Sequence, residues 1–174
     1  PAVCGDNFPT SYDSDTVWNY EIGTKGRFFD RKLSIAASAY YITWKNIQQA
    51  IYVPACGIQY TTNVGSAVSK GFDLQAELRA THALTLEASV GYTNARFSAD
   101  AIDALSQATL ALKGDSLDVV PWTVTVGAQY DFSLLGKDAF VRADYEYNSR
   151  RTTPTPAEDP GTTYYDPGLV PNPV

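Results

Sequence analysis

Residues 69–98 constrain the fold more than any other stretch of the chain. Apolar side chains alternate with charged or small polar ones along residues 72–80, and they do so again along residues 84–92. A short polar break, Thr81-His82, separates the two runs. A period of two is typical of β-strands that have one apolar and one polar face. The stretch therefore predicts an antiparallel hairpin built from two long strands.

The same alternation recurs before and after this hairpin. It predicts an all-β fold, an antiparallel meander of about six long strands. The phase of the alternation becomes unclear at residues 42–47, where we expect a β-bulge. Residues 101–112 are expected to form a short helix, because Ala and Leu are strong helix formers. The expected strands lie near residues 16–29, 32–49, 60–80, 84–98, 121–133 and 138–150.

The connections between the expected strands alternate in length. Those at residues 30–31, 81–83 and 134–137 are short, whereas those after the second, fourth and sixth strands are long. Antiparallel strands would place all short turns at one end and all long loops at the other. Aromatic residues mark both ends of the apolar faces, as in the two girdles of transmembrane barrels. The residues expected to face lipid in these girdles are Trp18, Phe28, Tyr41, Phe72, Tyr92, Trp122, Tyr130, Tyr145 and Tyr147.

A soluble β-sandwich or a lipocalin-like barrel would show the same periodicity. Three features favour a membrane instead. Several strands exceed about 10 residues, the length that crosses a bilayer on a tilt. The polar faces carry both charge signs, which suits a lumen, and the apolar faces are rich in Ala, which would build only a thin core. Because a transmembrane barrel needs about 8 strands or more, the sequence predicts part of a larger barrel wall.

The charged residues on the polar faces include several carboxylates. Asp73, Glu77 and Glu87 could suggest acid–base chemistry, but basic residues are expected to face them on neighbouring strands. We therefore expect ion pairs along a lumen wall rather than a catalytic site. The residues expected to face the lumen are Glu21, Lys25, Arg27, Asp73, Glu77, Arg79, Glu87, Asp131, Arg142, Asp144 and Glu146.

Other function classes are disfavoured by composition and motifs. The net charge of −6 argues against a nucleic-acid partner. No run of 18 apolar residues is present, so no transmembrane helix is expected. The single histidine, His82, is expected to be a solvated turn residue. The sequence thus predicts neither an enzyme nor a cofactor or metal site, while a soluble β-rich binding or adhesion module and a passive porin wall stay open.

Five segments of the sequence are similar to segments of a known family. They occur in that family's order between Trp18 and Arg151, and no single one is specific, but together they resemble the C-terminal part of the β-barrel of TonB-dependent outer-membrane receptors. The segments are WNYEIGTKGRFFDRKLSIAASAYYITWKNIQ, SKGFDLQAELRAT, LTLEASVGYTNARF, GDSLDVVPWTVTVGAQYDF and FVRADYEYNSRR.

The resemblance implies a bacterial outer-membrane location and a complete barrel of about 22 strands with a plugged lumen. The plug would be an N-terminal domain, and a short N-terminal box would bind TonB to energise uptake. The cargo would be siderophore-bound iron, cobalamin, a carbohydrate or another scarce nutrient, contacted by loops near residues 52–62, 99–119 and 151–174. The chain contains no Met, plug, TonB box or terminal strand. We therefore expect residues 1–174 to be one partial barrel segment, surrounded by outer-membrane lipid.

The two cysteines, Cys4 and Cys56, fit no four-ligand zinc pattern. Cys4 precedes a strand that leaves the long-loop end, and Cys56 follows a strand that returns to it. Both would therefore lie outside the cell, where conditions are oxidising. We predict a disulfide between them.

Overall fold

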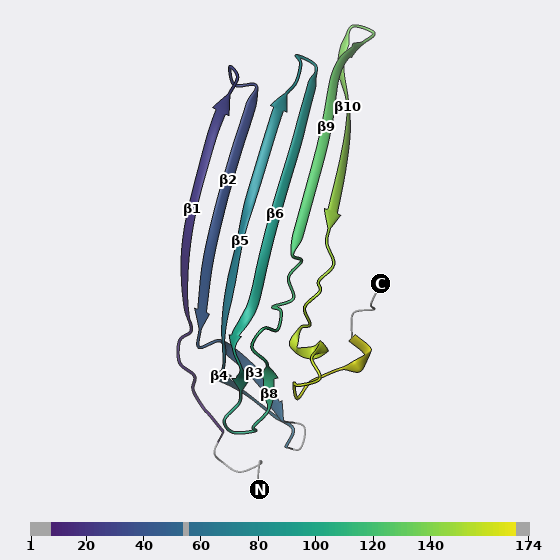
Figure 1. Ribbon diagram of the computed structural model, residues 1–174. Helices are drawn as coiled ribbons and strands as arrows, with labels where there is room; N and C mark the ends of the chain where they lie inside the picture. Colours follow the sequence, from purple (N-terminus) through teal and green to yellow (C-terminus); the bar gives the residue numbers. More distant parts are fainter. Residues whose placement is uncertain (1–7, 54–55, 170–174) are drawn as a thin grey trace.

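A computed structural model describes residues 8–53 and 56–169, and within them six long strands form one antiparallel sheet (Figure 1). The strand order is β1-β2-β5-β6-β9-β10, so the long strands pair in the order of the chain. The predicted antiparallel meander of about six long strands is therefore confirmed. The strands are β1 (Thr16–Phe28), β2 (Leu33–Lys45), β5 (Ser66–Arg79), β6 (Leu84–Ala99), β9 (Trp122–Leu134) and β10 (Lys137–Asn148).

Tight turns connect the long strands at one end of the sheet. Residues 29–31 all have positive φ between β1 and β2, and Leu135-Gly136 form a two-residue turn with φ of 52° and 75° between β9 and β10. Such turns match the twist of a hairpin. Between β5 and β6, the Thr81 hydroxyl accepts hydrogen bonds from the backbone N–H groups of Ala83 and Leu84. These turns fix the register of each hairpin.

The long connections gather at the opposite end of the sheet (Figure 1). Strands β3 (Gln48–Val53) and β4 (Ile58–Asn63) form one small hairpin, and β7 (Ala101–Ile102) and β8 (Thr109–Ala111) form another. Two 3₁₀ turns, η1 (Pro156–Glu158) and η2 (Pro167–Leu169), follow β10. In the described part of the chain, no helix has the length and apolar character needed to cross a membrane.

Buried apolar side chains are found at this loop end. Two clusters form there, one around Phe97 and one around Ile51, and two long connections and the segment before β1 contribute to them. The six-stranded sheet is a single layer along most of its length, so it has no second layer to bury its faces. The buried apolar residues of the described chain are Ile47, Ile51, Val53, Tyr60, Val64, Ala67, Ala95, Phe97, Ala101, Ala108 and Ala111.

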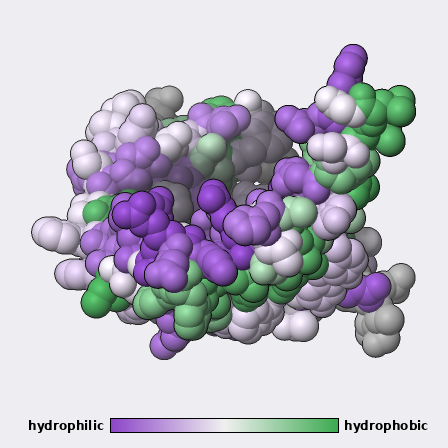
Figure 2. Space-filling view, turned by 90° about the horizontal axis from the view of Figure 1, so that it is seen from above, coloured by the Kyte–Doolittle hydropathy of each residue, from purple (hydrophilic) through white to green (hydrophobic). Residues whose placement is uncertain are grey.

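The strand register segregates the two faces of the sheet. It aligns Ile35, Ala76, Ala88, Val126 and Tyr145 in one row across five strands, and this face is apolar through the middle of the sheet. We call it the outer face, and the polar face the inner face. Seen along the strands, hydrophilic side chains gather around the hollowed side and hydrophobic ones lie on the opposite side (Figure 2).

No described segment covers the middle of the outer face. Ile22 is 77% exposed, Leu74 41% and Val126 43%. In a soluble sandwich these side chains would form the core and would be buried. The outer face therefore leaves apolar side chains uncovered, an arrangement that is typical of the wall of a transmembrane barrel.

The helix expected at residues 101–112 does not form, and that prediction was wrong. The Asp103 carboxylate accepts hydrogen bonds from the backbone N–H and hydroxyl of Ser106, and Gln107 has a positive φ of 59°. These contacts turn the chain back, so that Ala101 and Ala111 pair across the β7–β8 hairpin at 1% exposure each. Tertiary burial of small side chains thus outweighs their intrinsic helix propensity.

Three expected strand features also differ from the structure. The second strand ends at Lys45, because Asn46 adopts a positive φ of 55° and redirects the chain into β3. The expected strand at 60–80 is divided by Gly65, whose φ of 78° separates β4 from β5. The bulge lies not at 42–47, where pairing is regular, but at the start of β5, between Ser66 and Ala67.

The segregation of faces predicts how charge is tolerated in the middle of the sheet. Val126→Arg would place a guanidinium in lipid and should lower the free energy of unfolding by about 2–4 kcal/mol if the site lies near the bilayer midplane. The neighbouring Thr125→Arg is the matched control, because its side chain lies on the polar inner face and should cost little. Denaturation of the full-length protein in phospholipid bilayers measures both; equal losses would contradict a lipid-facing outer surface.

Candidate functional site

The inner face brings together most of the charged residues of the sheet. The register aligns Arg27, Ser34, Glu77, Glu87 and Asp144 in one row, with Gly127 between the last two. Glu77 and Glu87 are therefore directly opposite each other, an unfavourable pairing of like charges unless cations lie nearby.

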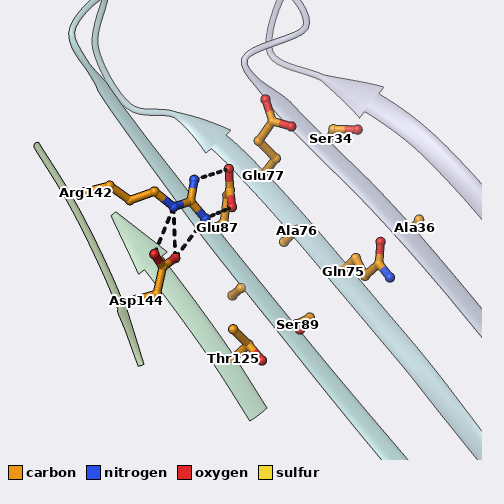
Figure 3. A pocket seen from close by; sticks show the side chains of 12 residues that line it. Ser34, Ala36, Gln75, Ala76, Glu77, Glu87, Ser89, Thr125, Arg142 and Asp144 are labelled. Atoms are coloured by element: carbon orange, nitrogen blue, oxygen red, sulfur yellow. Dashed lines mark hydrogen bonds and ion pairs between the residues drawn. The ribbon is translucent and has the colours of Figure 1, made fainter. Parts of the chain in front are cut away.

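Arg142 supplies the cation for this row. Its Nη2 lies 2.7 Å from Glu87 Oε2 and 2.8 Å from Asp144 Oδ1, and its Nε donates to both carboxylate oxygens of Asp144 at 3.0 Å. Figure 3 shows the guanidinium between the two carboxylates, with Glu77 apart from them on the neighbouring strand. Glu77 is instead 3.6 Å from Arg79. The three side chains of Arg142, Glu87 and Asp144 form what we call the inner ion cluster.

Gly127 makes room for the inner ion cluster. A Cβ atom at this position would lie 2.7 Å from Asp144 Oδ1 and 3.2 Å from Arg142 Nη2. The missing side chain lets the guanidinium cross from β10 over β9 to reach Glu87 on β6. Without this gap the carboxylate and the guanidinium would have to shift.

A hollow of about 330 Å³ lies beside the inner ion cluster on the inner face. Its walls include Glu77, Glu87 and Asp144, and hydroxyl and amide groups from Ser89 and Gln75. These three carboxylates are contacted by two guanidinium groups, those of Arg142 and Arg79, so negative charge is in slight excess. The hollow can accept hydrogen bonds from a cationic or hydroxyl-rich group.

The other residues predicted to face the lumen lie on the inner face but outside this cluster. Asp131 accepts a hydrogen bond from Gln129, and Glu146 accepts one from Asn148. Across residues 8–53 and 56–169, no salt bridge joins the remaining four to another side chain. These four are Glu21, Lys25, Arg27 and Asp73.

The residues predicted for the aromatic girdles all lie on the outer face by register. At the loop end, the rings of Phe72, Tyr92 and Trp122 contact one another on adjacent strands, with centroid distances of 4.7–6.0 Å. Trp18, Tyr41, Tyr145 and Tyr147 continue this band on β1, β2 and β10. Phe28 and Tyr130 lie toward the turn end. Their role as lipid anchors stays a prediction.

A buried polar group stabilises the loop end. The Tyr60 hydroxyl donates to Asp103 Oδ2 at 2.5 Å and joins β4 to the β7–β8 hairpin, 43 residues apart in sequence. Burial and the hydrogen bond to Asp103 raise the pKa of Tyr60 to about 12. Burial opposes the charge of Asp103, but hydrogen bonds from Ser106 and Tyr60 outweigh it and lower the pKa of that carboxyl.

A second polar group closes the segment after β10. Arg151 forms a two-pronged salt bridge with Glu158, whose carboxylate also accepts from the backbone and hydroxyl of Thr155. Neither this group nor the Tyr60–Asp103 bond was predicted from the sequence, because neither lies in a periodic stretch. The run TPAE at residues 155–158 matches a capping box and is the one signal that could have found it.

The remaining predictions from the sequence concern the two cysteines, the single histidine and the expectation of no metal site. Cys4 lies outside the described residues, so its pairing with Cys56 stays a prediction, although Cys56 is disulfide-bonded in the structure. His82 is exposed in the turn between β5 and β6. Among the residues that the structure describes, no group of three or more His, Cys, Asp or Glu side chains is arranged to hold a metal ion.

The Arg151–Glu158 salt bridge predicts that the segment at residues 151–169 loosens in acid. The adjacent guanidinium lowers the pKa of Glu158 to about 2, whereas an unperturbed glutamate has a value of about 4.3. Because the folded pKa is lowered, this carboxylate stabilises the fold above about pH 4.3 and loses that contribution, of the order of 3 kcal/mol, as the pH falls through the folded value.

Hydrogen exchange of residues 151–169 from neutral to acidic pH measures this loss. Glu158→Gln should remove most of the pH dependence. Asp118→Asn is the control, because that carboxylate lies 3.3 Å from Arg151 but is 78% exposed, and it should change little. A Glu158→Gln variant that opens with the same pH profile as the unmodified protein would contradict the assignment.

Comparisons with known proteins agree with this geometry. A model of the family described as TonB dependent receptor-like, beta-barrel matches residues 4–169. Among solved structures, the chain is similar to "The FrpB iron transporter from Neisseria meningitidis (F3-3 variant)", with a TM-score of 0.55 and 21% sequence identity. The likeness covers 72% of this chain and 17% of that transporter chain. This chain thus shares the fold of a small part of the transporter. No curated protein matches the chain.

The family match spans almost the whole sequence and confirms the resemblance that the five segments predicted. The family is one of receptors and transporters rather than of enzymes. The chain belongs to the TonB-dependent receptor β-barrel family of the bacterial outer membrane.

Proposed function

We propose that this chain forms six strands of the wall of a receptor that takes up a scarce nutrient across the outer membrane, with energy supplied through TonB. The observation that carries this proposal is the contrast between the two faces of a single-layer sheet. Apolar side chains such as Ile22 and Val126 are exposed on the outer face, and the inner ion cluster lies on the other. A barrel wall between lipid and a filled lumen requires this contrast.

The inner face is suited to contact a plug. The inner ion cluster is only partly screened, with Arg142, Glu87 and Asp144 side chains exposed by 36%, 42% and 49%. Glu87 and Asp144, which line the hollow beside it, share Arg142 and have no second salt-bridge partner among the described residues. A plug domain that supplies Lys, Arg or hydroxyl groups would satisfy them, and charged contacts of this kind can be rearranged at small cost when cargo passes.

The loop end is suited to receive cargo. Ala67 and Phe97 belong to the inner face by register, and they pack against Val64, Ala101 and Ala111 from the connecting loops. The loops therefore fold across the inner side of the sheet rather than away from it, which narrows the opening. Ala101 and Ala111 lie in the expected cargo loop at 99–119, and Val64 lies two residues beyond the one at 52–62.

For the nutrient class, we propose siderophore-bound iron ahead of cobalamin or a carbohydrate. The name of the transporter with the similar fold supports iron, although the likeness extends over a small part of that protein. The loop sequences contain no motif that identifies a particular siderophore.

Uptake by the full-length receptor tests the proposal. In cells that lack other receptors for the cargo, we expect uptake of ferric siderophore, cobalamin or oligosaccharide to saturate at low concentration and to stop when TonB is deleted. A passive porin would let small solutes through with or without TonB, and a soluble module would stay monomeric without detergent. Either result would overturn the proposed function.

A residue-level test uses the fold of the loop end. Asp103→Ala removes the acceptor for Tyr60 and Ser106 and leaves the buried Tyr60 hydroxyl without it, which should cost about 1–3 kcal/mol locally. We expect weaker cargo binding with normal insertion of the barrel, measured by equilibrium binding and by folding gels. Asp100→Ala is the matched control, since Asp100 is exposed and accepts only the Lys113 backbone N–H. Equal binding losses in both variants would contradict a specific role for the Tyr60–Asp103 bond.

A further inference from the structure

Charges on the outer face of the six long strands are all positive. The register assigns every Asp and Glu of these strands to the inner face, whereas four cations lie on the outer face. Three of them lie toward the loop end and one lies at the turn end. They are Lys45, Lys70 and Arg96 at the loop end, and Lys137 at the turn end.

The three loop-end cations lie just beyond the aromatic band. Counting only outer-face residues toward the loop end, Lys70 directly follows Phe72 on β5. On β6, Arg96 is the second such residue after Tyr92. Lys45 is likewise the second after Tyr41 on β2. Aromatic girdles lie at the level where acyl chains meet head groups. The cations are therefore placed at the level of the head groups themselves.

Arg96 is oriented by its neighbours and leaves its end groups free. Asn94 Nδ2 donates to the Tyr92 hydroxyl at 3.3 Å, and Arg96 Nε donates to Asn94 Oδ1 at 3.0 Å. This chain of hydrogen bonds fixes the guanidinium relative to the aromatic band. In the described part of the protein, neither Nη atom of Arg96 has a hydrogen-bond or salt-bridge partner.

A hollow of about 360 Å³ opens beside Arg96. Tyr92 and Trp122 from the aromatic band form part of its wall, and Arg150 lines it as well. Of the residues that line it, none is acidic, and only Arg151 among its arginines has a salt bridge, to Glu158 and Asp118. The hollow thus combines aromatic rings with Arg96 and Arg150, neither of which has a salt bridge to another described residue.

We propose that this hollow, with Lys70 beside it, binds the phosphate of a phosphorylated glycolipid in the outer leaflet of the outer membrane. Guanidinium groups bind phosphate with paired, charge-assisted hydrogen bonds. The aromatic walls face the acyl chains, so the occupant carries both a lipid part and an anionic part. The inference rests on the proposed barrel placement, with the long loops outside the cell.

The probe is diphosphorylated lipid A in phosphatidylcholine nanodiscs that carry the full-length receptor. Arg96→Gln or Arg150→Gln should each weaken binding about fivefold, and the double variant roughly 25-fold. Lys137→Gln removes one outer-face cation at the turn end and should leave binding unchanged. The variant that carries both Arg96→Lys and Arg150→Lys keeps the two positive charges and should bind more tightly than the double Gln variant. Folding gels check that each variant inserts.

Three results would overturn the proposal. They are unchanged binding in the double variant, an equal loss in Lys137→Gln, and binding of inorganic phosphate as tightly as lipid A, which would indicate a site for a soluble anion. TonB-dependent uptake is measured on the same variants. If the double variant loses lipid A binding and keeps uptake, the lipid site is supported apart from the transport function. If the unmodified receptor binds lipid A but takes up no nutrient, only the proposed function fails.

Discussion

Lipid offers no hydrogen-bond partner to a peptide group, so a strand that crosses a membrane must pair with neighbours along its whole length. The sheet meets this demand: all 13 residues of β1 pair with β2, and the pairing of β2 with β5 is equally continuous. Among the described residues, the outer edges of β1 and β10 have no strand partner, and β6 pairs with β9 only from Leu84 to Tyr92. In a closed barrel, further strands would cover those edges, since an open edge invites aggregation.

Because the strands pair continuously, the two-residue period of the sequence places polar and apolar side chains on opposite faces of the sheet. In the middle of the sheet each register row is mainly apolar or mainly polar, so Val126 and Glu87 lie on opposite faces. The loop-end aromatic band crosses these rows obliquely, from Trp18 on β1 to Tyr145 on β10. A band that is level with a membrane surface but oblique to the register indicates strands tilted against the membrane normal, as barrels require.

The loop end is held by a different kind of interaction. There the chain leaves the sheet, and buried side chains such as Ile51 replace strand pairing as the source of order. Polar groups are tolerated in this small core because each has a partner: Asp103 has Tyr60 and Ser106, and Glu158 has Arg151 and Thr155. Such contacts can be opened locally without disturbing the sheet, which suits the proposed role of the loop end in receiving cargo.

The sequence by itself determined the number of long strands, their order along the chain, the end to which the loops belong and the face of each strand residue, because alternation and turn chemistry are local properties. It did not determine which inner-face charges meet, since the reach of Arg142 across Gly127 to Glu87 depends on three strands aligned in register. It also misassigned residues 101–112, where helix propensity is local but the burial of Ala101 and Ala111 depends on segments far along the chain. Only the tertiary structure decided these contacts, because they join residues whose separation in sequence carries no periodic signal.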